Sequence, residues 1–192
     1  MRGKGCDEDR QPDVPGTWPL SGLLIVVEGP TGAGKTTLVE RLTKKIHLPV
    51  VHRARPPGRL DPSVVEEWYR DALLQRVSAG LILDRWIYSN PVYSRVLANQ
   101  PRISFTRCEE SALQSFDRCV TIFLHADAPT LLRRINRRDK PTMAPLKDLE
   151  TLEKVVKLYQ DSYNSCQLTK CQLSGTAAEV YAAARKFITE PQ

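Results

Sequence analysis

The chain has 192 residues, of which 41% are hydrophobic and 26% are charged, and its formal net charge is +6. This composition excludes a chain that is disordered throughout, and no apolar run approaches the roughly 20 residues that span a bilayer. The positive charge favours anionic partners, but nucleic acids and small phosphorylated molecules satisfy it equally well.

Residues 1–21 contain three prolines, three glycines and mixed charges without periodicity. We therefore expect a flexible extension before one domain at 22–192. Short apolar runs alternate with helical patterns along this domain. The alternation predicts a three-layer α/β fold, in which helices flank a five-stranded parallel sheet. The expected strands lie at 23–27, 50–52, 81–83, 120–124 and 168–173.

Helix start signals fall between these strands. The Asp-Pro pair at 61–62 predicts a helix that continues to about residue 79. Capping-box spacing at 106–109 and at 176–179 predicts two more helix starts. Apolar residues repeated on one face predict two further helices. The expected helices are 36–46, 61–79, 107–116, 147–165 and 177–188.

The first strand leads into a loop of the form G-x-x-x-x-G-K-[ST] and then into a helix. Its glycines allow positive φ and a close approach, so that backbone N–H groups point at phosphates. A chance glycine loop is the alternative, but the strand, the helix and the Lys-Thr pair favour a cradle for ATP with Mg²⁺. The expected ATP-binding residues are Gly29, Pro30, Thr31, Gly32, Ala33, Gly34, Lys35, Thr36 and Thr37.

A carboxylate, Asp84, ends the apolar strand at 81–83 and is followed by Arg85. Ligands of open parallel sheets bind at the carboxyl ends of the strands. We therefore expect Asp84 to hold Mg²⁺ together with Thr36, and Arg85 to contact a phosphate. A structural ion pair between Asp84 and Arg85 is the alternative interpretation.

Four arginines gather in the segment LLRRINRRDK, after a helix start at Asp127-Ala-Pro129. Like charges three or four residues apart repel each other, so the cluster is either solvated or suited to an anion. Phosphoryl transfer needs cations that neutralise the transferred group. We expect a lid at about 133–145 that excludes water, with Arg133, Arg137 and Arg138 as catalytic candidates beside Arg134.

The segment HRARPPG at 52–58 follows the second strand, so its arginines should project over the same edge of the sheet. Arg55, held by two prolines, could clamp a phosphate of the acceptor. A basic surface loop is the alternative, and His52 is interpreted as structural. Trp68 and Arg70 should flank the acceptor pocket, where Trp68 could stack on a base, although core packing is the favoured interpretation of this residue.

These motifs resemble the thymidylate kinase family and its phage-type relatives, over most of residues 23–188. EGPTGAGKTT at 28–37 is similar to that family's phosphate loop, and RPPG at 55–58 to its R-E-P-G segment. DRWIYSNPVY at 84–93 is similar to its D-R-[YF]-x-x-S-x-x-A-Y block. The resemblance implies that Arg85, Ser89 and Tyr93 contact the acceptor, and that a lid arginine is catalytic.

Three residues depart from that pattern: Thr31 replaces an acidic residue, Pro56 replaces Glu, and Ser94 replaces Gln. The nearest competitors, the deoxynucleoside kinases, are similar in E-R-S-x-x-S-x-R-Y and use a carboxylate after the second strand as a base. Residues 50–60 contain no Asp or Glu. The absence of this carboxylate favours a monophosphate acceptor over an uncharged hydroxyl.

The sequence therefore predicts a kinase that moves the γ-phosphoryl of ATP, with Mg²⁺, onto a deoxynucleoside monophosphate, dTMP or a related pyrimidine first. Lys35 and Arg85 join the lid arginines as catalytic candidates. The alternatives are a kinase of a nucleoside or of a modified base in DNA, and an ATP-binding regulator without turnover. The expected partner is a small nucleotide, with no membrane and with nucleic acid less favoured. The resemblance also makes a homodimer an expectation.

The five cysteines are odd in number and lack the spacing of a disulfide framework. They fit reduced thiols, and the first residues lack the basic start and apolar core of an export signal. We therefore expect a cytoplasmic protein. Cys166 and Cys171 could form a metal pair, but small buried side chains are the favoured interpretation because no second Cys/His pair completes a zinc site.

Overall fold

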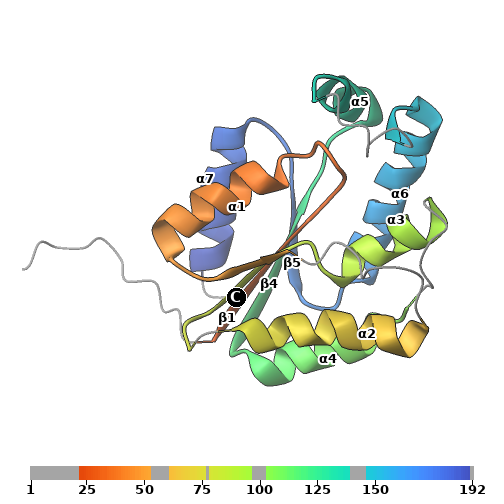
Figure 1. Ribbon diagram of the computed structural model, residues 1–192. Coiled ribbons are helices and arrows are strands. Elements are labelled where there is room, and N and C mark those ends of the chain that lie inside the picture. The colour runs from red at the N-terminus through yellow and green to blue at the C-terminus, as the bar shows by residue number, and fades with distance from the viewer. Residues whose placement is uncertain (1–21, 53–60, 77, 97–102, 139–145, 191–192) are drawn as a thin grey trace, which may run out of the picture.

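The computed structural model describes residues 22–52, 61–76, 78–96, 103–138 and 146–190. A parallel sheet forms its centre (Figure 1). The strand order is β2-β3-β1-β4-β5. The predicted five-stranded sheet is therefore confirmed. Every residue of the central strand is buried, as expected for a parallel strand covered on both faces. The strands are β1 (Leu23–Glu28), β2 (Val50–His52), β3 (Gly80–Asp84), β4 (Arg118–Leu124) and β5 (Thr169–Leu173).

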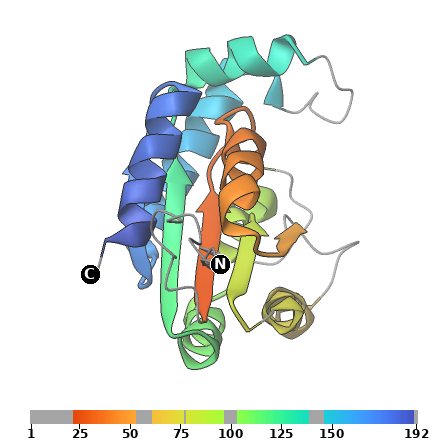
Figure 2. The ribbon, with the colours of Figure 1, turned by 90° about the vertical axis from the view of Figure 1, so that its left-hand side faces the viewer.

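Helices cover both faces of the sheet (Figures 1 and 2). On one face, α1 (Lys35–Ile46) and α7 (Ala177–Thr189) pack against β1 and β4. The other face is covered by α2 (Pro62–Arg70), α4 (Thr106–Ser115) and α6 (Leu149–Ser165). The short α3 (Asn90–Arg95) packs on α6, and α5 (Ala128–Asn136) lies beyond the tips of the strands. The 3₁₀ turns η1 (Asp71–Gln75) and η2 (Ile87–Ser89) join these elements.

Large side chains fill the space between the sheet and α2, α4 and α6. Trp86, Tyr69 and Tyr88 are fully buried there. Burying a side chain of this size stabilises the fold by about 1.5–3 kcal/mol. Among the helices of the described ranges, none is both long and apolar enough to cross a membrane.

The predicted helix ends are right in two places and wrong in two. The capping box at Thr176 and Glu179 is confirmed, since each residue's side chain bonds the other's backbone N–H. The proposed box at 106–109 is wrong, because Glu109 points into the core, where its Oε1 accepts from Tyr88 and from the Gln167 N–H. Asp127 caps α5 as expected. The helix expected to continue to residue 79 ends at Arg70 and passes into η1.

Two cations donate hydrogen bonds to the last carbonyls of helices, at the end of the sheet opposite the phosphate loop. Arg118 donates to the carbonyls of Phe187, Ile188 and Glu190 at the end of α7. Lys170 donates to carbonyls at the end of α6, including those of Tyr163 and Cys166 at 2.7 and 2.6 Å. The last carbonyls of a helix lack partners within it, so these contacts stabilise the fold.

Candidate functional site

The loop after β1 has the shape of a phosphate cradle. Gly29, Gly32 and Gly34 have φ values of 136°, 89° and 104°, which L side chains rarely adopt. A Cβ on Gly29 would also lie 2.4 Å from the carbonyl oxygen of Leu124 on β4. The glycines are therefore required by the turn itself. The loop leads directly into α1, which begins at Lys35. The backbone N–H groups at the start of a helix are suited to bind an anion.

Lys35 is folded onto this loop. Its Nζ donates to the carbonyls of Gly29 and Pro30, both at 2.7 Å, and the residue is 6% exposed. Burial lowers the pKa of the Lys35 ammonium well below its usual value, and the nearby charge of Arg85 lowers the pKa further. The ammonium thus lies at the centre of the cradle, where a phosphate oxygen could replace the two carbonyls.

The carboxyl ends of β2 and β3 bring two titratable residues together. His52 and Asp84 are partners in the strand register. The His52 Nδ1 lies 2.9 Å from the Asp84 Oδ2, and the two side chains are 69% and 9% exposed. A carboxylate can bond this nitrogen only if the nitrogen carries a proton, so in the neutral tautomer that fits this bond Nε2 is the acceptor nitrogen. The sequence analysis interpreted His52 as structural and gave it no partner.

Arg85 reaches back over the phosphate loop. Its φ of 69° is unusual for a residue other than glycine. Its guanidinium donates to the Gly29 carbonyl at 3.2 Å, to the Thr31 hydroxyl at 3.2 Å and to the Tyr159 hydroxyl at 2.6 Å. The structure therefore brings Arg85 to the loop, and its contact with a phosphate stays a prediction.

Three residues beside Arg85 make contacts that were not predicted from the sequence. Glu28 is fully buried, and its carboxylate accepts from the Trp86 N–H at 2.6 Å and from the Ser89 hydroxyl at 2.7 Å. The Ser89 hydroxyl also lies 3.0 Å from that of Tyr159 on α6. Burial raises the pKa of Glu28, while Arg85 opposes the rise. A charged residue at the end of an apolar strand was the one available signal for Glu28.

Of the four clustered arginines, Arg134 is the one whose described contacts reach the loop. Its guanidinium donates to the Gly32 carbonyl at 3.1 Å. Arg133 instead donates weakly to Thr130 on its own helix, at 3.4 Å. Arg137 and Arg138 are exposed at the end of α5. Arg138 is close enough for its charge to lower the pKa of Lys35. Residues 139–145 of the expected lid lie outside the described residues.

A cavity of about 200 Å³ opens beside the loop. Its walls come from the loop and α1, from the two arginines of α5, and from the start of α7. A wider hollow of about 530 Å³ adjoins it between α5 and α7 and shares Arg134 and Gly175 with it. The cavity is lined by Gly32, Ala33, Gly34, Thr37, Leu38, Leu124, Arg134, Arg138, Gly175, Ala177 and Val180.

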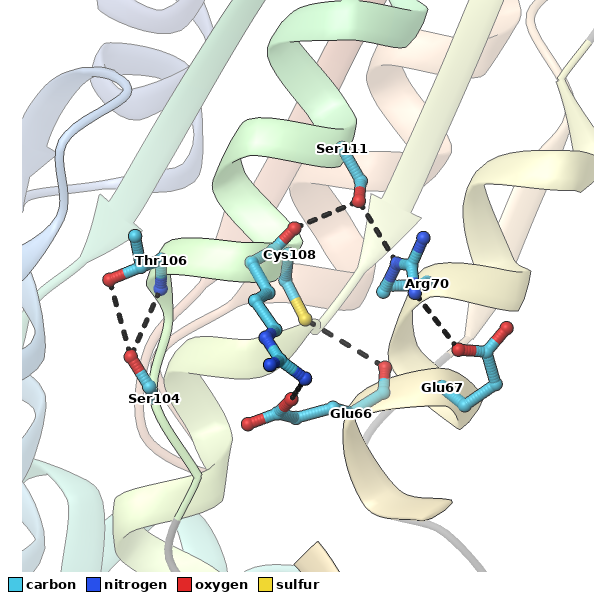
Figure 3. Close-up of polar contacts among 8 residues, drawn as sticks. Glu66, Glu67, Arg70, Ser104, Thr106, Cys108 and Ser111 are labelled. Atoms are coloured by element: carbon cyan, nitrogen blue, oxygen red, sulfur yellow. Dashed lines mark hydrogen bonds and ion pairs between the residues drawn. The ribbon is translucent and has the colours of Figure 1, made fainter. Parts of the chain in front are cut away.

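Of the remaining residues predicted to bind the acceptor, the structure describes the side chains of Trp68 and Arg70. Trp68 is partly buried at the border of the core and packs edge-to-face on Tyr69, with ring centroids 5.0 Å apart; its contact with a base stays a prediction. Arg70 donates to Glu67 and to Ser111 on α4, both at 3.0 Å (Figure 3). These contacts direct it to the α2–α4 surface rather than to the loop. Arg55 and the side chain of Tyr93 lie outside the described residues.

Thr36 and Asp84 fit the expectation of a magnesium site. Thr36 is exposed in the first turn of α1, and Asp84 is near enough for its charge to raise the pKa of Lys35. Mg²⁺ usually takes only one or two protein oxygens and completes its shell with phosphates and water. In the described ranges no group of three or more His, Cys, Asp or Glu side chains could hold a metal. A magnesium site that Thr36 and Asp84 share with a nucleotide therefore stays a prediction.

The chain matches no known protein-family profile. It is 24% identical to a shikimate kinase of Nitrobacter winogradskyi over 159 residues. This alignment covers 78% of this chain and 69% of that protein. Among solved structures it is similar to the Bacillus subtilis YorR protein in complex with phosphorylated GDP, with a TM-score of 0.63 and 19% identity over 86% of this chain and 95% of that one.

Two further structures share the fold. A deoxyadenosine kinase from M. mycoides aligns with a TM-score of 0.56 and 19% identity, over 85% of this chain and 97% of that one. A gluconokinase from Sinorhizobium meliloti aligns with a TM-score of 0.56 and 17% identity, over 89% and 92%. The sheet, the glycine loop and these likenesses define a P-loop kinase-like α/β fold. Its structural neighbours include nucleotide- and nucleoside-handling proteins as well as kinases of smaller molecules.

Proposed function

We propose that the protein transfers the γ-phosphoryl group of ATP, with Mg²⁺, to a deoxynucleoside monophosphate, dTMP or a related pyrimidine nucleotide first. The observation that carries this proposal is the convergence of Lys35 and Arg85 on the phosphate loop. Both cations donate to the Gly29 carbonyl, and two cations that meet at one point of the loop suit the negative charge of a phosphate chain. The match of residues 84–93 to the thymidylate kinase block supports the choice of acceptor.

Catalysis in this proposal depends on placement and charge neutralisation. The loop amides and Lys35 hold the donor phosphates, and Arg85 lies where donor and acceptor phosphates meet. Thr36 and Asp84 would hold Mg²⁺, which neutralises charge on the phosphates when it is bound. Arg134 and Arg138 line the cavity beside the loop, where the nucleoside part of ATP would lie with α5 closing over it.

A second candidate acceptor is an uncharged hydroxyl, as in a nucleoside. The His52–Asp84 pair favours it, because a carboxylate that orients an imidazole leaves the other ring nitrogen available to accept a proton. The hydroxyl oxygen would bond to the γ-phosphorus as the bond to the β-phosphate bridging oxygen breaks. ADP would leave, and the proton would pass to Nε2 of His52. The missing carboxylate at 50–60 is then no argument against a nucleoside.

Paired acceptors separate the two candidates. Purified protein with Mg·ATP is incubated with dTMP or with thymidine, and then with the other natural nucleosides and monophosphates, while ADP release and product mass are followed. A diphosphate product supports the proposal, and a new monophosphate supports the second candidate. ATP binding without turnover on any acceptor, including duplex DNA, would leave the non-catalytic regulator as the better account.

The His52→Gln variant tests the second candidate independently. Glutamine keeps a polar group but cannot accept a proton. If the acceptor is a hydroxyl, kcat should fall about 10²-fold while KM for ATP holds. Equal kcat values for the variant and the wild type would remove His52 from the chemistry.

A further inference from the structure

A chain of hydrogen bonds leads from Arg85 to a buried carboxylate. The Arg85 Nη1 can only donate, so the Tyr159 hydroxyl accepts from it at 2.6 Å. The Ser89 hydroxyl gives its one proton to Glu28 at 2.7 Å. The 3.0 Å contact between Ser89 and Tyr159 therefore has Tyr159 as its donor. Arg85 Nη1 also donates directly to the Ser89 hydroxyl, at 3.3 Å. Every bond then points in one direction, from the cation to the carboxylate, either through Tyr159 and Ser89 or through Ser89 alone.

The same carboxylate also fixes the backbone beside Arg85. The other oxygen of Glu28 accepts from the Trp86 N–H at 2.6 Å. That N–H belongs to the residue that follows Arg85, whose φ is 69°. A non-glycine residue keeps this backbone conformation only where its surroundings determine it. Glu28 thus holds both the main chain and, through two hydroxyls, the side chain of one arginine.

The residues of this chain of hydrogen bonds are buried, and burying a carboxylate costs free energy. Glu28 and Ser89 are fully buried, and Tyr159 is 6% exposed. A buried carboxylate is expensive to keep unless its oxygens are hydrogen-bonded and a cation is close. Here both oxygens are bonded, and the cation lies against the phosphate loop. The sequence analysis assigned Ser89 to the acceptor, but its hydroxyl is directed into this chain of bonds.

We propose that Glu28 is a positioning residue, which acts through Ser89 and Tyr159 to hold the Arg85 guanidinium against the phosphate loop. This inference rests on the proposed phosphoryl transfer for its purpose. Because Tyr159 lies on α6, the same relay also joins α6 to the phosphate loop. Arg85 is the group that meets the phosphate, and the other three act through it.

The test is a set of double-mutant cycles, read with inorganic tripolyphosphate as a probe that needs no acceptor and no turnover. Calorimetry measures its dissociation constant for Glu28→Gln and Tyr159→Phe, each in the wild-type and the Arg85→Ala backgrounds. We expect Arg85→Ala to weaken binding about 10²-fold and each relay variant to weaken it about tenfold. In the Arg85→Ala background neither relay variant should weaken binding further, because they act through Arg85.

A matched control is Glu109→Gln, which changes another buried glutamate that accepts from a tyrosine hydroxyl and a backbone N–H. It should leave tripolyphosphate affinity unchanged, because the hydrogen bonds described for Glu109 go to Tyr88 and Gln167 and not to Arg85. If Glu28→Gln does not fold, Tyr159→Phe, which loses one hydroxyl, still reads the relay.

Two results would overturn the inference. One is full tripolyphosphate affinity in the relay variants. The other is a loss that is equally large with and without Arg85. In an active preparation, the relay variants should also change the same kinetic parameter as Arg85→Lys, whether that is kcat or a KM. Absence of turnover with every acceptor would contradict the proposed function alone, since the binding cycles would still report on the relay.

Discussion

Arg85 and Arg118 are two arginines that both donate to backbone carbonyls, at opposite ends of the same sheet. Arg118 bonds three carbonyls at the end of α7, which have no partner within the helix. Arg85 bonds a carbonyl and a hydroxyl of the phosphate loop and is itself held by a relay of side chains. The first arginine completes the fold, whereas we propose that the second is held in place for a phosphate. On this proposal the same chemical group serves stability at one end of the sheet and binding at the other.

Removing the cation at the centre of the cradle should have the largest effect on turnover. Lys35→Ala should lower turnover at least about 10³-fold, because it removes the charge that lies where phosphate oxygens bind. The free energy of unfolding should change little, since Lys35 is a buried cation whose loss also removes a desolvation cost. Product formation and urea titrations measure the two effects. Turnover near the wild-type rate would end the assignment of this loop.

Replacing the two arginines, one at a time, should separate function from stability. Arg85→Lys keeps a cation beside the buried Glu28 carboxylate but loses the planar guanidinium, so it should lower kcat/KM at least about tenfold with a small change in the free energy of unfolding. Arg118→Ala should leave kcat/KM unchanged but lower the free energy of unfolding by about 1–3 kcal/mol, because carbonyls at the end of α7 lose their donors. Steady-state kinetics and urea unfolding on both variants check this. The comparison fails if both variants lose the same property.

Within the arginine cluster, the described hydrogen bond of Arg134 reaches the phosphate loop, so we expect Arg134 to act on the ATP side. Arg134→Ala should raise KM for ATP about tenfold, since it loses the contact with Gly32 and one wall of the cavity. Arg133→Ala is the matched control, because its described side-chain bond stays on α5. Initial rates at varied ATP decide between them. An effect of Arg133→Ala on KM for ATP as large as that of Arg134→Ala would contradict the contact.

The smallest expected effect concerns acid stability at the start of α7. Bonds to Thr176 lower the pKa of Glu179 below its ordinary value of 4.5. A carboxyl whose pKa is lower in the folded state contributes stability above its unfolded pKa and loses that contribution as the pH falls through the folded value. Glu179→Gln should therefore reduce the difference in urea midpoint between pH 6 and pH 3. An unchanged difference would show that the capping box does not titrate with folding.

Local features of the sequence were enough to predict the fold and the loop. Gly29 and Gly34 lie in the loop, next to Lys35 and Thr36, so the phosphate cradle is specified by neighbours in the chain. The alternation of apolar runs with helical patterns was likewise enough for five parallel strands. The order of those strands depends on how the connecting helices pack against the sheet. The alternation of strands and helices along the chain does not specify this order.

The relay could not be predicted in this way, because its bonds join residues that are far apart in the sequence. Ser89 bonds Glu28 across 61 residues and Tyr159 across 70. Tyr159 lies in an apolar stripe of α6 that reads as core, and only its hydroxyl reaches the site. The failed capping box has the same cause, since Glu109 finds Tyr88 and Gln167 as tertiary partners. Contacts between distant segments override local patterns at both places.

The central claim is that the phosphate loop delivers the γ-phosphoryl group of ATP to a nucleotide. Mg·ATP labelled with ¹⁸O in the γ-phosphoryl group, incubated with dTMP, tests it most directly by the mass of the nucleotide product. The account predicts labelled dTDP with the wild-type protein and none with Lys35→Ala. Label that appears only in inorganic phosphate, or label transfer that survives the loss of Lys35, would contradict it.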